Sequence, residues 1–194
     1  MKYVYVIFFL ALSTFQMFAQ VPQIGKSMGR WTGFGLESMK ANKEAGLDYI
    51  EVTMNNVIGK DTAGVWDRAA ALKADIDSAG LKVWSVHMPY SRTLDISVID
   101  DAKRAENVQY MKDMMRVAGI FHPQCIVLHP SSEPITPDER EQRLANSHAS
   151  IGELAPVAKE IGAVLCIENL PRTCLALDAT HKVPRNPGLP REEH

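Results

Sequence analysis

Cysteine is scarce in this sequence, and an excess of basic charge is missing. The chain has three cysteines, Cys125, Cys166 and Cys174, and so small and odd a number gives no disulfide framework. Cys125 and Cys166 stand in or beside apolar runs, which favours buried thiols. The 21 basic and 23 acidic residues give a formal net charge of −2 without a basic stripe. The sequence therefore lacks the clustered basic residues typical of a nucleic-acid-binding protein, and we expect no nucleic-acid partner.

The one marked apolar run at the start of the chain, residues 4–12, is too short to cross a bilayer, which takes about 20 residues. It follows the positive charge of Lys2 and precedes a small residue, Ala19. This pattern is typical of a secretory signal peptide over residues 1–19, although a buried first strand or helix is the alternative. No cysteine follows the run, so we expect no lipid anchor there. We expect an exported protein, periplasmic or secreted, without a stable membrane anchor.

Five short runs predict strands, and the segments between them have apolar residues at helical spacing. The last three runs are apolar almost to their ends, as in strands buried on both faces of a parallel sheet. Such alternation predicts parallel strands joined by right-handed crossovers, and Gly46, Gly80, Gly119 and Gly162 mark where the helices should stop. The predicted strands are Gln23–Met28, Tyr49–Met54, Lys82–His87, Cys125–His129 and Val164–Glu168.

A doubly wound sheet and a barrel both satisfy this order. No Gly-x-Gly-x-x-Gly follows the first strand, which removes one reason to prefer the doubly wound sheet. A closed eight-unit barrel takes about 250 residues, more than the 194 present. After Leu175 the apolar periodicity stops, and residues 176–194 predict a disordered tail. We therefore expect residues 20–175 to form a partial (βα) barrel, open rather than closed, in an apparently C-terminally truncated chain.

Three of the predicted strands end in a potential metal ligand, His87, His129 and Glu168, at intervals of about one strand–helix unit. Glu51 stands in the second strand at a similar interval before His87. Because side chains alternate along a strand, the polar residues should face a barrel interior, with the bulky Trp84 on the opposite face toward the helices. Barrel active sites lie at the carboxyl ends of the strands. Two imidazoles and a carboxylate suit zinc, manganese, iron or cobalt.

Each of these residues also has a structural explanation. A single histidine at a strand end is often a hydrogen-bonded structural residue, and Glu51 can equally be an ion-pair partner. Trp31 can stack on a sugar or pack in the core. Asn169 and Arg172 can bind substrate oxygens or fix their loop. The charges between Glu139 and Arg143 indicate a solvated helix face.

The motifs around these residues resemble the xylose isomerase-like TIM barrel superfamily, which includes sugar phosphate isomerases and epimerases, ketose 3-epimerases and endonuclease IV. The resemblance covers about residues 23–175. It rests on Asp48-Tyr49-Ile50-Glu51-Val52, Trp84-Ser85-Val86-His87-Met88-Pro89, Leu128-His129-Pro130 and Cys166-Ile167-Glu168-Asn169-Leu170-Pro171.

The resemblance implies that Glu168 binds a divalent metal (Mn, Zn, Co or Mg) and acts in proton transfer, as in the epimerases. Resemblance to endonuclease IV implies that His87, His129 and Glu168 are metal ligands. The family's later ligands, from strands six to eight, have no counterpart at a strand end in this sequence.

Three functions remain open at this point. The first is a metal-dependent sugar or sugar-phosphate isomerase or epimerase that transfers a proton next to a carbonyl, incomplete in this chain, with Trp31, Glu51, Asn169 and Arg172 as substrate-binding candidates. The second is an endonuclease IV-like phosphodiesterase. The third is a non-catalytic secreted fragment. We expect a small sugar or polyol as the partner, and self-association through the open sheet edges.

Overall fold

Five parallel strands form a single sheet in this computed structural model, which describes residues 22–29, 34–132, 134–168 and 170. The strands follow one another across the sheet in the order of the sequence, whereas a doubly wound sheet reverses direction at a switch point. The prediction of an open, partial barrel wall is therefore confirmed. The strands are β1 Gly25–Ser27, β2 Tyr49–Thr53, β3 Lys82–His87, β4 Cys125–Leu128 and β5 Val164–Ile167.

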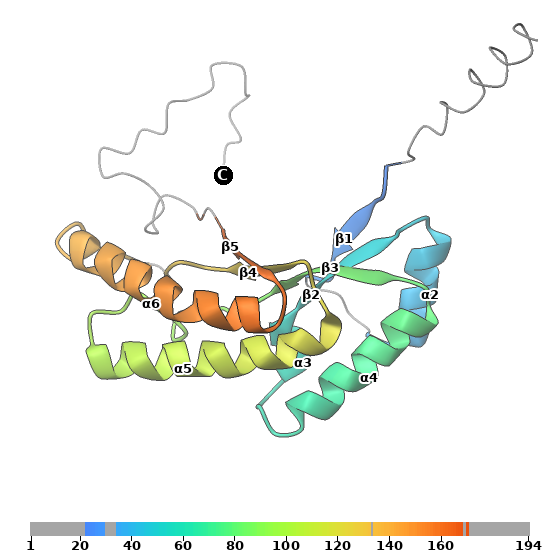
Figure 1. The fold of residues 1–194 in the computed structure, drawn as a ribbon, viewed down its shortest axis with the longest axis horizontal. Helices are drawn as coiled ribbons and strands as arrows, with labels where there is room; N and C mark the ends of the chain where they lie inside the picture. The colour runs from blue at the N-terminus through green and yellow to red at the C-terminus, as the bar shows by residue number, and fades with distance from the viewer. Residues whose placement is uncertain (1–21, 30–33, 133, 169, 171–194) are drawn as a thin grey trace, which may run out of the picture.

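The helices connect the strands and pack beside one another in chain order as an outer layer. Figure 1 shows α4, α5 and α6 along one face of the sheet. The helix α3 directly after β2 was not predicted. The helices are α2 Leu36–Glu44, α3 Met54–Ile58, α4 Val65–Ser78, α5 Asp101–Ala118 and α6 Arg140–Glu160, with a 3₁₀ turn, η1, at Gly119–Phe121.

The hydrophobic core lies between the sheet and the helices. In β2 and β4 every second residue is buried there, as strand alternation requires. The strands contribute Ile50, Val52, Val83, Val86, Ile126 and Leu128, and the helices contribute Met39, Ala69, Ile76, Met115 and Leu154, among others. The other face of the sheet is left for polar and half-buried side chains.

The glycines expected to end the helices do so in two ways. Gly46, Gly80 and Gly162 have positive φ angles of 91°, 73° and 76°, which only glycine adopts without strain. Gly119 has an ordinary φ, and a Cβ placed there would lie 3.0 Å from Cγ2 of Ile161. The absence of a side chain at Gly119 thus allows the end of α5 to pack against the end of α6.

The predicted orientation of Trp84 toward the helices is wrong, because β3 contains a bulge. Val83 pairs with Ile50 and Ser85 pairs with the next residue of β2, Glu51. Trp84 is therefore an extra residue in β3 that has no partner in the β2 register. The bulge keeps Val83 on the helix side and leaves Trp84 with an exposed fraction of 51%. The Trp84 ring meets the Tyr49 ring edge-on, with centroids 5.4 Å apart. Beyond the bulge, Ser85 and His87 occupy the inner face as predicted.

None of the helices in the part of the chain that the structure describes is long and apolar enough to span a membrane. The predicted signal peptide at 1–19 and the predicted tail at 176–194 lie outside the described residues.

Candidate metal centre

The side chains of His87, His129 and Glu168 converge at the carboxyl ends of β3, β4 and β5. Their potential ligand atoms all lie within 4.8 Å of one another. Oε2 of Glu168 is 2.9 Å from Nε2 of His87 and 3.1 Å from Nε2 of His129. The side chains are partly accessible, with exposed fractions of 14% for His87, 23% for His129 and 42% for Glu168. The expected convergence is therefore present, and the site is open to small molecules.

The sheet register produces this convergence. His87 pairs with Val127 of β4, and His129 follows Val127 by two residues, directly after β4 and on the same face. The Glu168 backbone continues the β4–β5 ladder, with its N–H donating to the carbonyl of Leu128 at 3.0 Å. In a parallel sheet the carboxyl ends of neighbouring strands lie at one edge. Residues that end successive strands on the inner face consequently meet there.

The hydrogen bonds of His87 make the site complementary to a cation. Nδ1 of His87 lies 2.9 Å from the carbonyl oxygen of Met88, and Nε2 faces a carboxylate oxygen of Glu168. A neutral imidazole that donates from Nδ1 presents a lone pair at Nε2 toward that oxygen. Two acceptors at this distance need a proton or a metal ion between them. A backbone carbonyl on Nδ1 is also the usual partner that orients a metal-binding histidine.

The environment of His129 favours its neutral, metal-binding form. Burial lowers the pKa of His129 below its usual value of 6.5, and the neighbouring His87 lowers it further, against an opposing effect of the Glu168 carboxylate. Imidazole must be unprotonated to bind a metal. The pKa shift and the geometry thus act in the same direction.

Tyr90, which the sequence analysis did not single out, covers the two imidazoles. Its ring stacks on His129 with centroids 4.8 Å apart and an interplanar angle of 25°, and it meets His87 edge-on at 5.0 Å. Asn55 holds the Tyr90 backbone, because its side chain donates to the Tyr90 carbonyl and accepts from the Tyr90 N–H, both at 3.1 Å. The sequence does contain a signal for this role, because Tyr90 is an aromatic residue in the loop directly after β3, the strand that ends in His87.

Glu51 does not join the cluster of His87, His129 and Glu168. It lies in the layer below His87 on the same face, where it accepts a hydrogen bond of 2.7 Å from Oγ of Ser85. Glu51, Ser85, Trp84 and Tyr49 help to line an open cavity of about 470 Å³ over the first three strands. The other predicted substrate-binding residues, Trp31, Asn169 and Arg172, lie outside the described residues.

The two described cysteines are half-buried rather than buried, which corrects the expectation from their apolar surroundings. Cys125 and Cys166 face the inner side of the sheet, not the core between sheet and helices. Burial raises the pKa of the Cys125 thiol above its usual value, and the adjacent Cys166 thiol adds to the effect. At neutral pH this disfavours the thiolate form of Cys125, the form that binds metals.

Residues 39–181 match a family model described as xylose isomerase-like TIM barrel. Together with the one-directional sheet and the three ligand-type residues at strand ends, this match shows that the chain belongs to the xylose isomerase-like TIM barrel family. No curated protein matches the sequence.

Solved structures of sugar epimerases share the fold. A D-psicose 3-epimerase, determined in the presence of D-fructose, superposes with a TM-score of 0.65 at 21% identity, over 78% of this chain and 54% of the other. A D-psicose 3-epimerase from Clostridium cellulolyticum H10, with D-tagatose, gives 0.66 at 19% identity over 78% and 54%. An L-ribulose 3-epimerase gives 0.57 at 24% identity over 79% and 51%. The chain thus spans about half the length of the structures that it matches.

Proposed function

We propose that this chain carries metal ligands of a metal-dependent sugar or sugar-phosphate isomerase or epimerase, an enzyme that works by proton transfer next to a carbonyl. The observation that carries the proposal is the convergence of His87, His129 and Glu168 within 4.8 Å at the active-site end of the strands. Family membership and the sugar epimerases with the same fold support the reaction class. Because the chain spans about half of those structures, the activity of a whole enzyme is part of the proposal.

The donor set fits a divalent transition metal better than magnesium. Two imidazoles and one carboxylate are a common ligand set for zinc and related ions, whereas magnesium prefers oxygen ligands. Ligands of a tetrahedral ion at about 2.1 Å lie about 3.4 Å apart. The separations of 2.9 and 3.1 Å from Oε2 of Glu168 are close to that value. A small opening of the cluster would seat zinc, manganese or cobalt.

Each residue has a distinct part in this proposal. His87 and His129 would be the imidazole ligands of the metal, with the His87 ring oriented by the Met88 carbonyl. Glu168 would be the carboxylate ligand, and it would exchange the proton next to the substrate carbonyl. Tyr90, a residue with an exposed fraction of 43%, shields the imidazoles and would contact the substrate. A divalent cation bound there supplies Lewis acidity toward a carbonyl and a neighbouring hydroxyl.

Proton exchange also needs an acid or base on the other side of the reacting carbon. Within the described residues, the cluster around Glu168 contains no second carboxylate. We therefore propose that the described residues are a catalytic half-site, and that full turnover needs a further carboxylate. Trp31, Asn169 and Arg172 are proposed to contact the substrate, as is Glu51 from the layer below.

The experiment combines metal binding with isotope exchange. The full chain is titrated with Zn²⁺, Mn²⁺, Co²⁺ and Mg²⁺ in competition with a chelating dye, and is then incubated with D-fructose or D-tagatose in D₂O. We expect one equivalent of transition metal to bind, with weaker Mg²⁺ binding, and deuterium to enter the sugar next to its carbonyl. A folded chain that binds none of the four ions would refute the proposal. Metal binding without deuterium exchange would show that the chain binds the metal but does not by itself transfer the proton next to the carbonyl.

A second candidate is an endonuclease IV-like phosphodiesterase. The observation in its favour is that both histidines, His87 and His129, take part in the cluster. The formal net charge of −2 opposes it, because nucleic-acid binding relies on basic surfaces. Cleavage of a duplex with one abasic site, compared with an intact duplex, separates the two candidates. Metal-dependent cleavage of only the abasic duplex would support the nuclease.

Export and self-association are also proposed. Intact mass of the protein from its native host should show loss of residues 1–19, and a mass that includes them would refute export. The open sheet exposes apolar residues at both edge strands, with exposed fractions of 57% for Ile24 and 64% for Val164. Size-exclusion chromatography should therefore show concentration-dependent association, and a monomer at all concentrations would count against it.

A further inference from the structure

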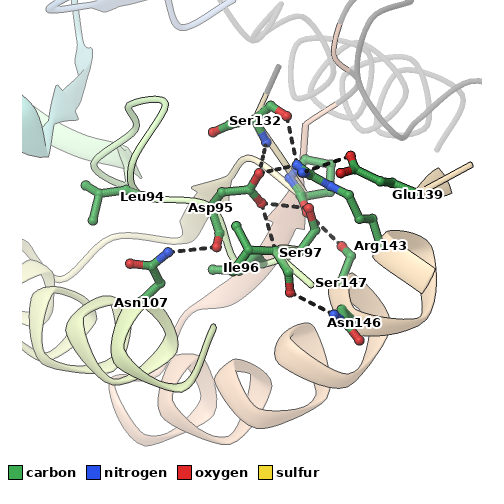
Figure 2. Close-up of polar contacts among 12 residues, drawn as sticks. Leu94, Asp95, Ile96, Ser97, Asn107, Ser132, Glu139, Arg143, Asn146 and Ser147 are labelled. Atoms are coloured by element: carbon green, nitrogen blue, oxygen red, sulfur yellow. Dashed lines mark hydrogen bonds and ion pairs between the residues drawn. The ribbon is translucent and has the colours of Figure 1, made fainter. Parts of the chain in front are cut away.

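A buried ion pair links the loop after β3 to helix α6 beside the candidate metal centre. Asp95 and Arg143 have exposed fractions of only 3% and 8%, and Oδ2 of Asp95 pairs with the guanidinium of Arg143 (Figure 2). Arg143 also lies 3.7 Å from Glu139 of the preceding turn. The expectation of a solvated helix face is therefore wrong for Arg143, because its guanidinium turns inward to the loops.

The Asp95 carboxylate binds groups from three segments. One oxygen accepts from the N–H and the hydroxyl of Ser97, at 2.8 and 2.6 Å. The other accepts from the Ser132 N–H at 3.0 Å and from Arg143. Arg143 in turn donates to the Ser132 carbonyl at 3.1 Å. The backbone of Ser132, three residues after His129, is thus held at both its N–H and its carbonyl.

Further hydrogen bonds tie the two loops to each other and to α5 and α6. They place the segment after His87 and the segment after His129 in one connected polar network (Figure 2). Three serine hydroxyls donate to backbone carbonyls: Ser132 to Ser91 at 2.8 Å, Ser147 to Pro130 at 2.8 Å and Ser150 to Ile96 at 2.7 Å. Two asparagine amides do the same: Asn107 to Asp95 at 2.8 Å and Asn146 to Val98 at 2.7 Å.

This network acts on the residues next to the metal centre. Pro130, which follows His129, is held by Ser147, and Ser91, which follows Tyr90, is held by Ser132. A buried ion pair contributes little net stability, because desolvation offsets the attraction, but its geometry is fixed by the surrounding hydrogen bonds. The Asp95–Arg143 pair is therefore better suited to fixing the positions of the two loops than to raising the free energy of unfolding.

We propose that Asp95 and Arg143 are positioning residues that lock the loops after β3 and β4 together and thereby set the placement of His129 under Tyr90. The proposal rests on the proposed function in so far as the placement serves metal binding. Supporting residues around a metal site typically change its affinity about 10- to 100-fold. We expect an effect of that size although neither residue belongs to the converging cluster.

The test uses the full chain and three variants. Asp95→Asn removes the charge but keeps the size. Arg143→Lys keeps the charge but lacks the planar guanidinium, which reaches Asp95 and the Ser132 carbonyl through Nη2 and faces Glu139 through Nη1. Ile76→Ala is the control, because it removes buried volume under α4 without altering any polar contact of the loops. Urea unfolding ranks the stability of all variants. The readouts are Co²⁺ affinity with the visible spectrum of bound cobalt, and the imidazole NMR resonances of metal-free His129, assigned with His129→Asn.

We expect Asp95→Asn to weaken Co²⁺ binding about 10- to 100-fold, to change the cobalt spectrum and to shift the His129 resonances. Arg143→Lys should show the same changes to a smaller extent, and it serves as the test if Asp95→Asn does not fold. Ile76→Ala should change none of these readouts, although it lowers stability. Folded Asp95→Asn or Arg143→Lys protein with unchanged His129 resonances would overturn the proposal, as would unchanged Co²⁺ affinity where the parent chain binds cobalt.

The two proposals fail separately. If the parent chain binds no cobalt, the proposed function fails, and the metal-free His129 resonances alone decide whether the pair positions the loops. Equal changes in Ile76→Ala and Asp95→Asn would mean that the readouts follow stability, and this too would overturn the positioning role.

Discussion

Replacement of Glu168 by glutamine isolates the contribution of the carboxylate to the candidate metal centre. The substitution keeps the size of the side chain and removes its negative charge, while His87 and His129 remain in place. Structural zinc sites bind with about 10–16 kcal/mol for four ligands, or about 2.5–4 kcal/mol for each. Each 1.4 kcal/mol is tenfold in affinity, so Glu168→Gln should weaken Zn²⁺ binding by about 60- to 700-fold.

The same substitution should have little effect on folding. The Glu168 side chain is 42% exposed, and its contacts are with His87 and His129. Exposed ion pairs typically contribute about 0–1 kcal/mol. We therefore expect the free energy of unfolding of the metal-free protein to change by no more than about 1 kcal/mol. A selective loss of metal affinity distinguishes a ligand from a structural residue.

Competition of the protein with a chelating dye for Zn²⁺, together with urea unfolding, measures both quantities. Glu51→Gln is the matched control, because Glu51 is also a carboxylate on the inner face of the sheet but lies outside the cluster. Its Zn²⁺ affinity should stay within about twofold of the parent chain, a difference below about 0.4 kcal/mol. Equal losses in the two variants, or no loss in Glu168→Gln, would refute the assignment of Glu168 as a ligand.

Three further predictions concern stability. Tyr90→Leu should lower the free energy of unfolding by about 1 kcal/mol in urea titrations, because it removes the stacking on His129, and no loss would show that the contact is neutral. Because the pKa of His129 is lowered from 6.5 in the folded chain, the unfolded chain binds its proton first as pH falls. Stability should therefore decrease below about pH 6.5, with a smaller decrease in His129→Asn; identical pH dependence would contradict the shift. Gly119→Ala should cost about 1–3 kcal/mol through its contact with Cγ2 of Ile161, and the same substitution should cost less in an Ile161→Ala background, which lacks Cγ2.

Much of the fold follows from periodic sequence signals. Apolar runs between amphipathic segments predicted the parallel strands and the outer helices, because burial between the sheet and one helix layer imposes these periods. The positions of His87, His129 and Glu168 were also predictable. Residues that end successive strands on the inner face of a parallel sheet must meet at one edge, whatever the loops do.

Other features depend on tertiary contacts that leave no periodic signal. The bulge that turns Trp84 away from the helices depends on the register between β2 and β3. The stacking of Tyr90 on His129 depends on the course of a loop. Asp95 and Arg143 are 48 residues apart, and Arg143 in sequence resembles any charged residue of a solvated helix. Sequence patterns alone were enough to predict the strand–helix order and the strand-end ligands. Which polar residues are buried beside those ligands depends on the packing of two loops, because burial of a charge depends on the partners that folding brings to it.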